Sequence, residues 1–315
     1  MKVITCFSYK GGSGRTVAAA NIASALASIK EVAAIKKPLE RKVALIDLDV
    51  FSAGTHRVFG ISNQELADNL DFGIQDYLLE QIEPTVHLKE NALTFSKKSK
   101  IPLIIDGGAN YCDKSFTLFP AKPRPDQRFV VQKFHENLLL ELMIVLEKEG
   151  YHYVIIDGES GARSMADIAL RLSDIVLMFF RLTWQHVEGT QSWASKYIEM
   201  PDFPPFYIIP TCVPLVEDED KIYLSSPGFD RLKKMTSFIP RESGLNDFAE
   251  KYKGIENAPK QGFFWAKKIC IHESLILKGG ESIIVYNPQP EVANERAAQD
   301  YYEIASYINS IHPPG

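Results

Sequence analysis

A glycine-rich segment near the start of the sequence has the residue types that bind phosphate groups. It reads Lys10-Gly11-Gly12-Ser13-Gly14-Arg15-Thr16, follows the apolar residues 3–7 and runs into an alanine-rich helical pattern. Glycines let backbone N–H groups converge on phosphate oxygens, and the start of a helix adds the positive end of its dipole. The threonine hydroxyl at the last loop position can coordinate Mg²⁺. We expect a nucleotide's phosphates to be held by Gly11, Gly12, Ser13, Gly14, Arg15, Thr16 and Val17.

Two positions depart from the general pattern of such loops, which is G-x-x-x-x-G-K-[ST]. Tyr9 stands at the first glycine position, and Arg15 stands where the pattern has lysine. Arginine keeps the positive charge and adds a planar fork that can grip two phosphate oxygens, but it is bulkier and more rigid than lysine. We therefore expect nucleotide binding to tolerate Arg15 better than hydrolysis does.

Carboxylates follow two of the apolar runs in the sequence. Asp47 and Asp49 come directly after residues 43–46, and Asp157 comes directly after residues 153–156. Parallel sheets place ligands at the carboxyl ends of their strands, where carboxylates can hold Mg²⁺ or its waters. The sequence predicts a magnesium site beside the loop, to which Thr16 and Asp157 contribute.

Short β-branched runs alternate with helical patterns through most of the chain, which is typical of β-α-β units. Runs such as residues 153–156 show no polar alternation, as expected for parallel strands with helices on both faces. We expect an α/β fold with a mostly parallel, doubly wound sheet, forming one P-loop domain over residues 1–315 with irregular insertions near 110–129 and 216–267. The predicted strands are 2–8, 42–47, 102–105, 153–157, 175–180 and 206–209, and the predicted helices are 16–34, 129–149, 164–172, 186–198 and 291–311.

The loop and the acidic strand ends together resemble the deviant Walker A ATPases of the ParA/MinD superfamily, whose loop reads K-G-G-x-G-K-[ST] and also lacks the first glycine. The resemblance implies ATP and Mg²⁺ as cofactors and a homodimer that closes around ATP, with Lys10 reaching the nucleotide of the other copy. It also implies that Asp47 supports Mg²⁺ or its waters, which completes the expected magnesium site of Thr16, Asp47 and Asp157. Asp49 is implied to orient the attacking water, so Lys10 and Asp49 are the expected catalytic residues. With Tyr9 and Arg15, the loop is similar to a branch that reads Y-K-G-G-x-G-R-[ST].

The resemblance extends along nearly the whole chain, but two of its parts are altered. Gly161 matches a glycine that contacts the γ-phosphate in the family, whereas Glu159 and Ser160 replace the usual residues before it. Thr211 and Ile271 lie where the family contacts the adenine base, without the usual asparagine and proline. The choice of ATP over GTP therefore rests on the resemblance.

The composition is that of a folded protein without strong attraction to polyanions. The chain has 315 residues, of which 45% are hydrophobic, and a net charge of −5. This charge gives the molecule as a whole no attraction to nucleic acid or to an anionic membrane. The sequence does not exclude a local basic patch. No segment reaches the roughly 18 apolar residues of a membrane span, and the first apolar stretch is too short for a signal peptide. We expect a cytoplasmic protein that does not bind membranes.

Three functions fit these residues. The first is a slow ATPase switch that dimerises around Mg-ATP and regulates or positions an unidentified protein partner, in a signalling or defence module. The second is a nucleotide-binding sensor or scaffold with little or no hydrolysis, which Arg15 and Glu159-Ser160 would explain. The third is a DNA or plasmid partition ATPase. Since one fold serves all three, the sequence leaves the partner open.

Overall fold

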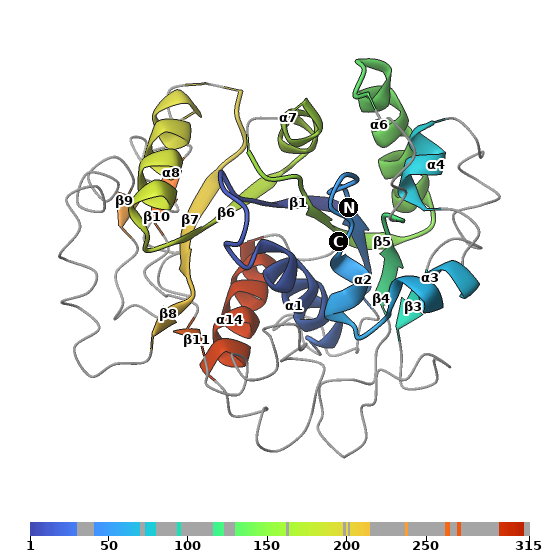
Figure 1. The fold of residues 1–315 in the computed structure, drawn as a ribbon, viewed down its shortest axis with the longest axis horizontal. Helices are drawn as coiled ribbons and strands as arrows, with labels where there is room; N and C mark the ends of the chain where they lie inside the picture. Colours follow the sequence, from blue (N-terminus) through green and yellow to red (C-terminus); the bar gives the residue numbers. More distant parts are fainter. Residues whose placement is uncertain are drawn as a thin grey trace.

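A nine-stranded sheet forms the centre of the molecule (Figure 1). The structure is a computed structural model that describes residues 1–29, 41–69, 73–79, 93–95, 116–122, 130–161, 164–197, 200, 202–214, 237–238, 262–264, 270–271 and 296–311. The strand order is β3-β4-β2-β5-β1-β6-β7-β10-β9. All neighbouring pairs in it are parallel except β3 and β4. The strands are β1 (Lys2–Phe7), β2 (Lys42–Asp47), β3 (Leu93–Phe95), β4 (Phe116–Phe119), β5 (Tyr151–Asp157), β6 (Ile175–Arg181), β7 (Phe206–Thr211), β9 (Ser237–Phe238) and β10 (Gly262–Phe264).

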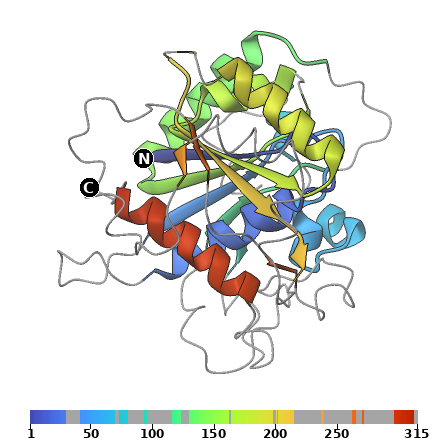
Figure 2. The ribbon, with the colours of Figure 1, turned by 90° about the vertical axis from the view of Figure 1, so that its left-hand side faces the viewer.

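Helices cover both faces of this sheet. Figure 2 shows α1 and α14 on one side of the strands and α6, α7 and α8 on the other. A separate two-stranded sheet pairs β8 (Val213–Pro214) with β11 (Cys270–Ile271). This arrangement confirms the predicted α/β fold with a mostly parallel, doubly wound sheet. The helices are α1 (Arg15–Ser28), α2 (Thr55–Val58), α3 (Asn63–Asn69), α4 (Ile74–Leu78), α6 (Phe134–Lys148), α7 (Ser164–Arg171), α8 (Trp184–Tyr197) and α14 (Arg296–Ile311).

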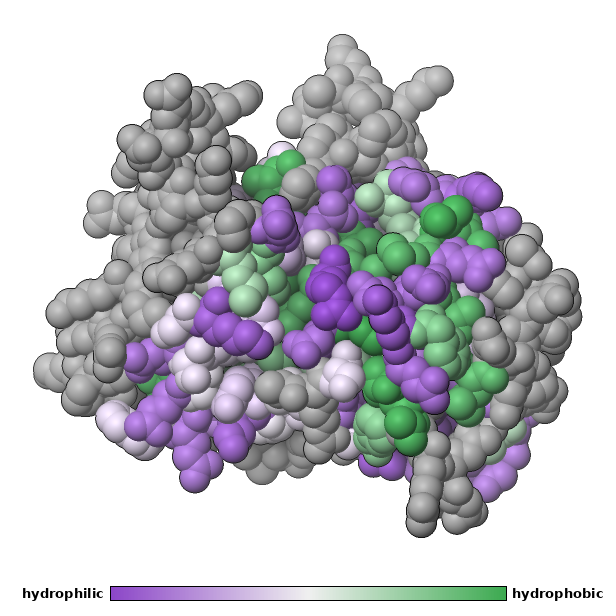
Figure 3. All heavy atoms as spheres, turned by 90° about the horizontal axis from the view of Figure 1, so that it is seen from above, coloured by the Kyte–Doolittle hydropathy of each residue, from purple (hydrophilic) through white to green (hydrophobic). Residues whose placement is uncertain are grey.

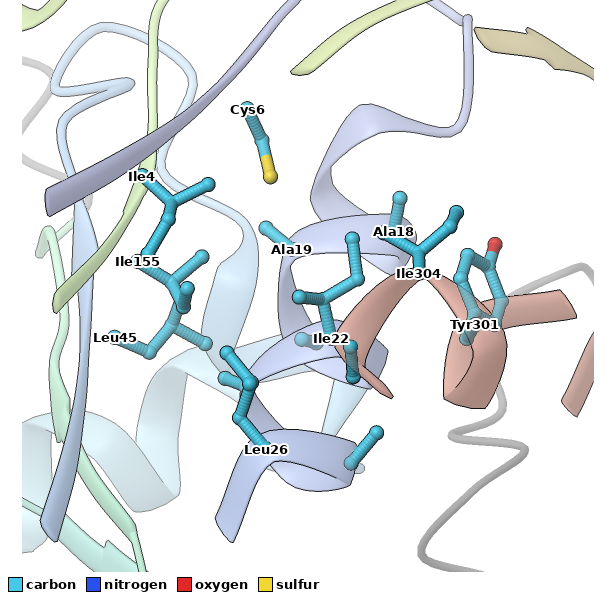
Figure 4. Close-up of a cluster of buried hydrophobic side chains, with 14 of the residues drawn as sticks. Ile4, Cys6, Ala18, Ala19, Ile22, Leu26, Leu45, Ile155, Tyr301 and Ile304 are labelled. Carbon is cyan, nitrogen blue, oxygen red and sulfur yellow. The ribbon is translucent and has the colours of Figure 1, made fainter. Parts of the chain in front are cut away.

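Helix α1 is buried almost all round because it is packed between the sheet and α14. Its small side chains, such as Ala18 and Ala19, let the neighbouring elements approach closely, and Ile22 fills the space between them (Figure 4). Tyr301 and Ile304 of α14 pack in the same cluster. A helix that is buried on most sides needs no strong amphipathic pattern. The packing fixes the start of α1 against the end of β1, where the glycine-rich loop lies.

The opposite face of the sheet is covered by α6 and α7. Leu139 and Leu142 of α6 pack on Val154 and Ile156 of β5 in a second core cluster. Other α6 side chains remain exposed, among them Phe134, Leu140 and Ile144. In the view of Figure 3, hydrophobic and hydrophilic residues are mixed, and hydrophobic ones gather on the side where Figure 1 places α6.

The predicted elements agree with the structure except at several ends. Helix α6 begins at Phe134 rather than at residue 129, and α8 begins at Trp184, two residues before the predicted start. Strand β4 lies within the predicted insertion near 110–129 and joins the main sheet beside β2. The predicted strand 102–105 lies outside the described residues, as does most of the predicted insertion 216–267. Within the described residues, no helix combines the length and hydropathy needed to cross a membrane.

Candidate nucleotide-binding site

The glycine-rich loop joins the end of β1 to the start of α1. Gly12 and Gly14 have φ angles of 77° and 78°, in the left-handed region that glycine adopts without steric cost. No side chain caps the start of α1, and its first turn contains no acidic residue. The positive end of this helix is therefore available to an anion. The Ser13 hydroxyl is also buried and has no hydrogen-bond partner among the described residues.

A residue at the end of strand β7 forms a hydrogen bond with the loop. The hydroxyl oxygen of Thr211 lies 2.5 Å from the carbonyl oxygen of Ser13 and 3.1 Å from that of Phe180, so its proton can be donated to either. Thr211 is buried, and Ile271 pairs with Pro214 in the short sheet that follows β7. Thr211 thus supports the loop in this structure, and the contacts of Thr211 and Ile271 with a base stay predictions.

The three predicted carboxylates meet where β2 and β5 end. Asp47 lies opposite Asp157 in the pairing of these strands, and Cys6 of β1 lies on the other side of Asp157. Asp47 and Asp157 are buried, whereas Asp49 keeps 13% of its side chain exposed. The sheet register therefore brings together acidic groups that are about 110 residues apart in sequence.

Arg15 links this acidic cluster to the loop. Its Nε donates to Asp157 Oδ1 at 2.7 Å, and its terminal Nη2 donates to Asp49 Oδ2 at 2.8 Å. The side chain of Arg15 is only 7% exposed. Burial alone would lower the pKa of Arg15, but the charges of Asp157 and Asp49 outweigh burial and raise it. The guanidinium therefore serves as a counterion of the carboxylates, and its contact with phosphate stays a prediction.

Thr55 completes the cluster, although no motif in the sequence points to it. Its hydroxyl donates to Asp157 Oδ2 at 2.9 Å, and its backbone N–H donates to Asp47 Oδ2 at 3.1 Å. Asp47 Oδ1 accepts a further hydrogen bond from the backbone of Asp49 at 3.1 Å. Burial and the negative charge of Asp157 raise the pKa of Asp47 to about 7, and the hydrogen bond from Thr55 opposes this rise.

The chemistry of this cluster fits Mg²⁺ bound together with a phosphate group. Three carboxylates face one guanidinium, so the cluster carries excess negative charge, and hard oxygen ligands are those that Mg²⁺ prefers. No group of three or more His, Cys, Asp or Glu side chains among the described residues is arranged to hold a metal ion unaided. The oxygens of Asp47 and Asp157 already accept hydrogen bonds from the protein. These carboxylates therefore suit the waters around Mg²⁺ better than the ion itself, and the role of Thr16 as a ligand stays a prediction.

Lys10 lies at the opposite end of the loop and is exposed. The backbone N–H of Gly161 donates to the carbonyl oxygen of Ser8 at 3.0 Å, which joins the segment after β5 to the residues just before Lys10. The structure thus separates the predicted site residues into two groups. One is the buried group of Arg15 with the carboxylates, and the other is the exposed start of the loop.

The fold and the loop geometry define a P-loop protein. The family model described as "AAA domain" matches residues 1–201, and the chain belongs to this family. The match and the fold together confirm the predicted membership of the ParA/MinD superfamily of P-loop ATPases. No curated protein matches the chain.

Solved structures with the same fold come from bacteria and archaea. The MinC:MinD cell division complex of Aquifex aeolicus contains a chain with 17% identity and a TM-score of 0.60, over 98% of this chain and 96% of that one. A putative plasmid partition protein of Borrelia burgdorferi bound to AMPPNP has 18% identity and a TM-score of 0.57, over 98% and 99%. The septum site-determining protein MinD of Pyrococcus horikoshii, complexed with Mg-ADP, has 16% identity and a TM-score of 0.55, over 99% and 97%.

Proposed function

We propose that this protein is an Mg-ATP-dependent switch that dimerises when it binds ATP and hydrolyses ATP slowly. The observation that carries the proposal is the pairing of two features at one sheet edge: an uncapped helix start behind left-handed glycines, and three carboxylates beside it. The helix start can bind the phosphate groups, and the carboxylates can bind the hydrated magnesium ion that accompanies them. The AMPPNP and Mg-ADP complexes of two structural neighbours support the same ligands.

Each residue of the site has a distinct task in this proposal. The backbone of residues 11–17 binds the phosphates, and Thr16 together with the waters held by Asp47 and Asp157 binds Mg²⁺. Asp49 orients the attacking water. Since Asp49 Oδ2 accepts a hydrogen bond from Arg15 in this structure, water competes with Arg15 for this oxygen and must exchange with it to take the same position. This exchange gives a physical reason for slow turnover.

Exposure of Lys10 supports a shared site between two copies of the chain. The side chain lies at the surface, and no hydrogen bond or ion pair with another described residue holds its amine. Lys10 of each copy would then stabilise the phosphates bound by the other copy, so ATP would favour the dimer. The two nucleotide states would present different surfaces to a protein partner in the cytoplasm. In this proposal residues 1–315 act as one domain.

The proposal is tested by measuring molecular mass and phosphate release on the same samples. With Mg-ATP, light scattering should give twice the protomer mass, and with Mg-ADP it should give the protomer mass. Lys10→Ala should lose both the dimer and turnover, and Asp49→Ala should lose turnover. Lys196→Ala removes an exposed lysine from α8 and is the matched control, which should behave as wild type. A protein that stays monomeric and releases no phosphate under all these conditions would contradict the proposal.

A nucleotide-binding sensor without turnover is the second candidate, favoured by the two ion pairs of Arg15. These bonds engage one oxygen each of Asp49 and Asp157, so this candidate requires that they persist when ATP binds and keep the attacking water from its position. In a single-turnover assay, wild-type protein would then bind ATP without cleaving it, whereas Arg15→Lys would start to cleave it. Cleavage by wild-type protein within a single turnover would exclude this candidate.

A plasmid or DNA partition ATPase is a further alternative, because several structural neighbours are described as plasmid partition proteins. The net charge of −5 does not favour it. Binding of duplex DNA only in the presence of Mg-ATP, weakened by added salt, would support this alternative over a protein partner.

A further inference from the structure

Gly189, in the middle of helix α8, is in unusually close contact with the ring of Tyr9. A Cβ atom added at Gly189 would lie 2.1 Å from Tyr9 Cδ1 and 2.7 Å from Cε1, which is far inside normal contact distance. Glycine within a helix is less favourable than alanine because its backbone loses more conformational freedom on folding. The close approach of the ring explains why glycine occupies position 189, since the ring lies directly on the helix backbone there.

Tyr9 is fixed from two directions at the point where the loop leaves β1. Its half-buried ring packs against the cluster that contains Phe7, Val187 and Trp193, between the sheet and α8. The backbone on its N-terminal side accepts the hydrogen bond from Gly161 at Ser8. An aromatic residue at this position, where the general loop pattern has glycine, therefore adds an anchor that a glycine would lack.

Lys10 directly follows this anchor and lies close to other basic side chains. His186, in the first turn of α8, has a pKa below its ordinary value because of burial first, then the positive charges of Arg181 and Lys10. Lys10 and Arg181 are both exposed. Helix α8 follows β6, which lies parallel to β1 (Figure 1), so the first turn of α8 and the loop that carries Lys10 both follow strand ends at the same edge of the sheet. Like charges at this edge disfavour a Lys10 side chain folded back onto α8.

We propose that Tyr9 is a positioning residue, whose ring, seated on the bare backbone of Gly189, fixes the direction in which Lys10 leaves the loop. This inference rests on the proposed function, in which Lys10 acts on the nucleotide of a second copy. When the backbone at Lys10 is already ordered, less conformational entropy is lost as its long side chain forms such a contact. Tyr9 therefore favours dimerisation without itself touching the nucleotide.

The test combines two variants that disturb the contact with two matched controls. Gly189→Ala displaces the ring, and Tyr9→Ala removes it. Tyr9→Phe keeps the ring, and Ser192→Ala changes an exposed residue of the same helix. Thermal unfolding of each variant confirms that the comparison concerns folded protein.

Three measurements are made on each variant: hydrogen exchange of the peptide containing residues 9–12, affinity of the protomer for Mg-ADP, and dimerisation with Mg-ATP. Gly189→Ala and Tyr9→Ala should raise exchange in this peptide and weaken dimerisation at least tenfold, while affinity for Mg-ADP changes less than twofold. The double variant should be no worse than Tyr9→Ala alone, because the alanine at position 189 then meets no ring. Tyr9→Phe and Ser192→Ala should behave as wild type.

The outcomes separate this inference from the proposed function. If wild-type protein fails to dimerise, the proposed function fails, and hydrogen exchange still decides whether the ring holds the loop. Unchanged exchange in both Gly189→Ala and Tyr9→Ala overturns the inference in every case. Raised exchange with undiminished dimerisation also overturns it, because the ring would then hold the loop without positioning Lys10.

Discussion

The two ends of the phosphate loop carry the same charge in opposite environments. Arg15, at the end that starts α1, is buried and forms ion pairs with Asp49 and Asp157. Lys10, at the end that leaves β1, is exposed, and no ion pair with another described residue holds it. Charge alone therefore does not tell what a basic residue of this loop does. The buried cation stabilises the protomer, whereas the exposed cation is available to another molecule.

Removal of the buried cation should have the largest effect on stability. Arg15→Ala leaves the carboxylates of Asp49 and Asp157 without their counterion, and breaking a buried pair in this way costs about 3–5 kcal/mol. We expect a value near the lower end, because Asp49 keeps some exposure to solvent. Urea denaturation of the nucleotide-free protein measures this loss. Lys10→Ala is the matched control and should change the free energy of unfolding by less than about 0.5 kcal/mol. Equal losses in the two variants would contradict the comparison.

The acidic cluster should also make stability depend on pH. The pKa of Asp47 is about 7 in the folded protein against an ordinary value of 3.8, so between these values the folded chain holds a proton that the unfolded chain has lost. This contribution is fully present below pH 3.8 and is lost as pH rises through 7, so the free energy of unfolding falls over this window by on the order of 2–4 kcal/mol.

The pH dependence is measured by denaturation at several pH values. Asp47→Asn cannot titrate and should flatten the slope between pH 4 and 7. Asp202→Asn, which changes an exposed carboxylate, should leave the slope as in wild type. A slope that persists in Asp47→Asn would place the titrating group elsewhere.

The sequence predicted the parts of this site that depend on local pattern. A strand, a glycine-rich loop and a helix follow one another along the chain, and Asp47 and Asp157 end apolar runs, so their meeting follows from parallel strands. The partners of Arg15 depend on the direction of its own side chain, which points toward the ends of β2 and β5. The spacing of residues in the sequence does not specify that direction. The loop pattern led instead to the prediction that Arg15 contacts phosphate.

Thr55 and strand β4 were missed for related reasons. Thr55 belongs to a four-residue helix, too short to leave a periodic pattern, and its contact with Asp157 spans 102 residues. Strand β4 is a short run, Phe116–Phe119, inside a segment without clear periodicity. The contact of Gly189 with Tyr9 left one signal in the sequence, a glycine within a helical pattern. That signal indicates that some other group approaches the helix backbone closely, but it does not show that this group is the ring of Tyr9.

A smaller loss of stability should follow from removing the hydroxyl that supports Asp157. Thr55→Val keeps the shape of the side chain but removes the donor to Asp157 Oδ2. A hydrogen bond to a charged group contributes about 1.5–3 kcal/mol, so we expect a loss in that range, below the loss in Arg15→Ala. Thr55→Ser retains the hydroxyl and should recover most of the free energy of unfolding. If Thr55→Val is as stable as wild type while Thr55→Ser is destabilised, the methyl group rather than the hydroxyl is what matters.

The smallest expected effect is electrostatic and concerns the exposed end of the loop. The positive charge of Lys10 lowers the pKa of His186, after burial and Arg181, so Lys10→Ala should raise that pKa slightly. An NMR titration of the His186 ring measures the change. Lys196→Ala removes a lysine from the other end of α8 and should leave the titration unchanged. Because salt screens exposed charges, the rise should shrink as ionic strength increases. If the pKa of His186 does not change in Lys10→Ala at low salt, the charge of Lys10 does not reach the first turn of α8.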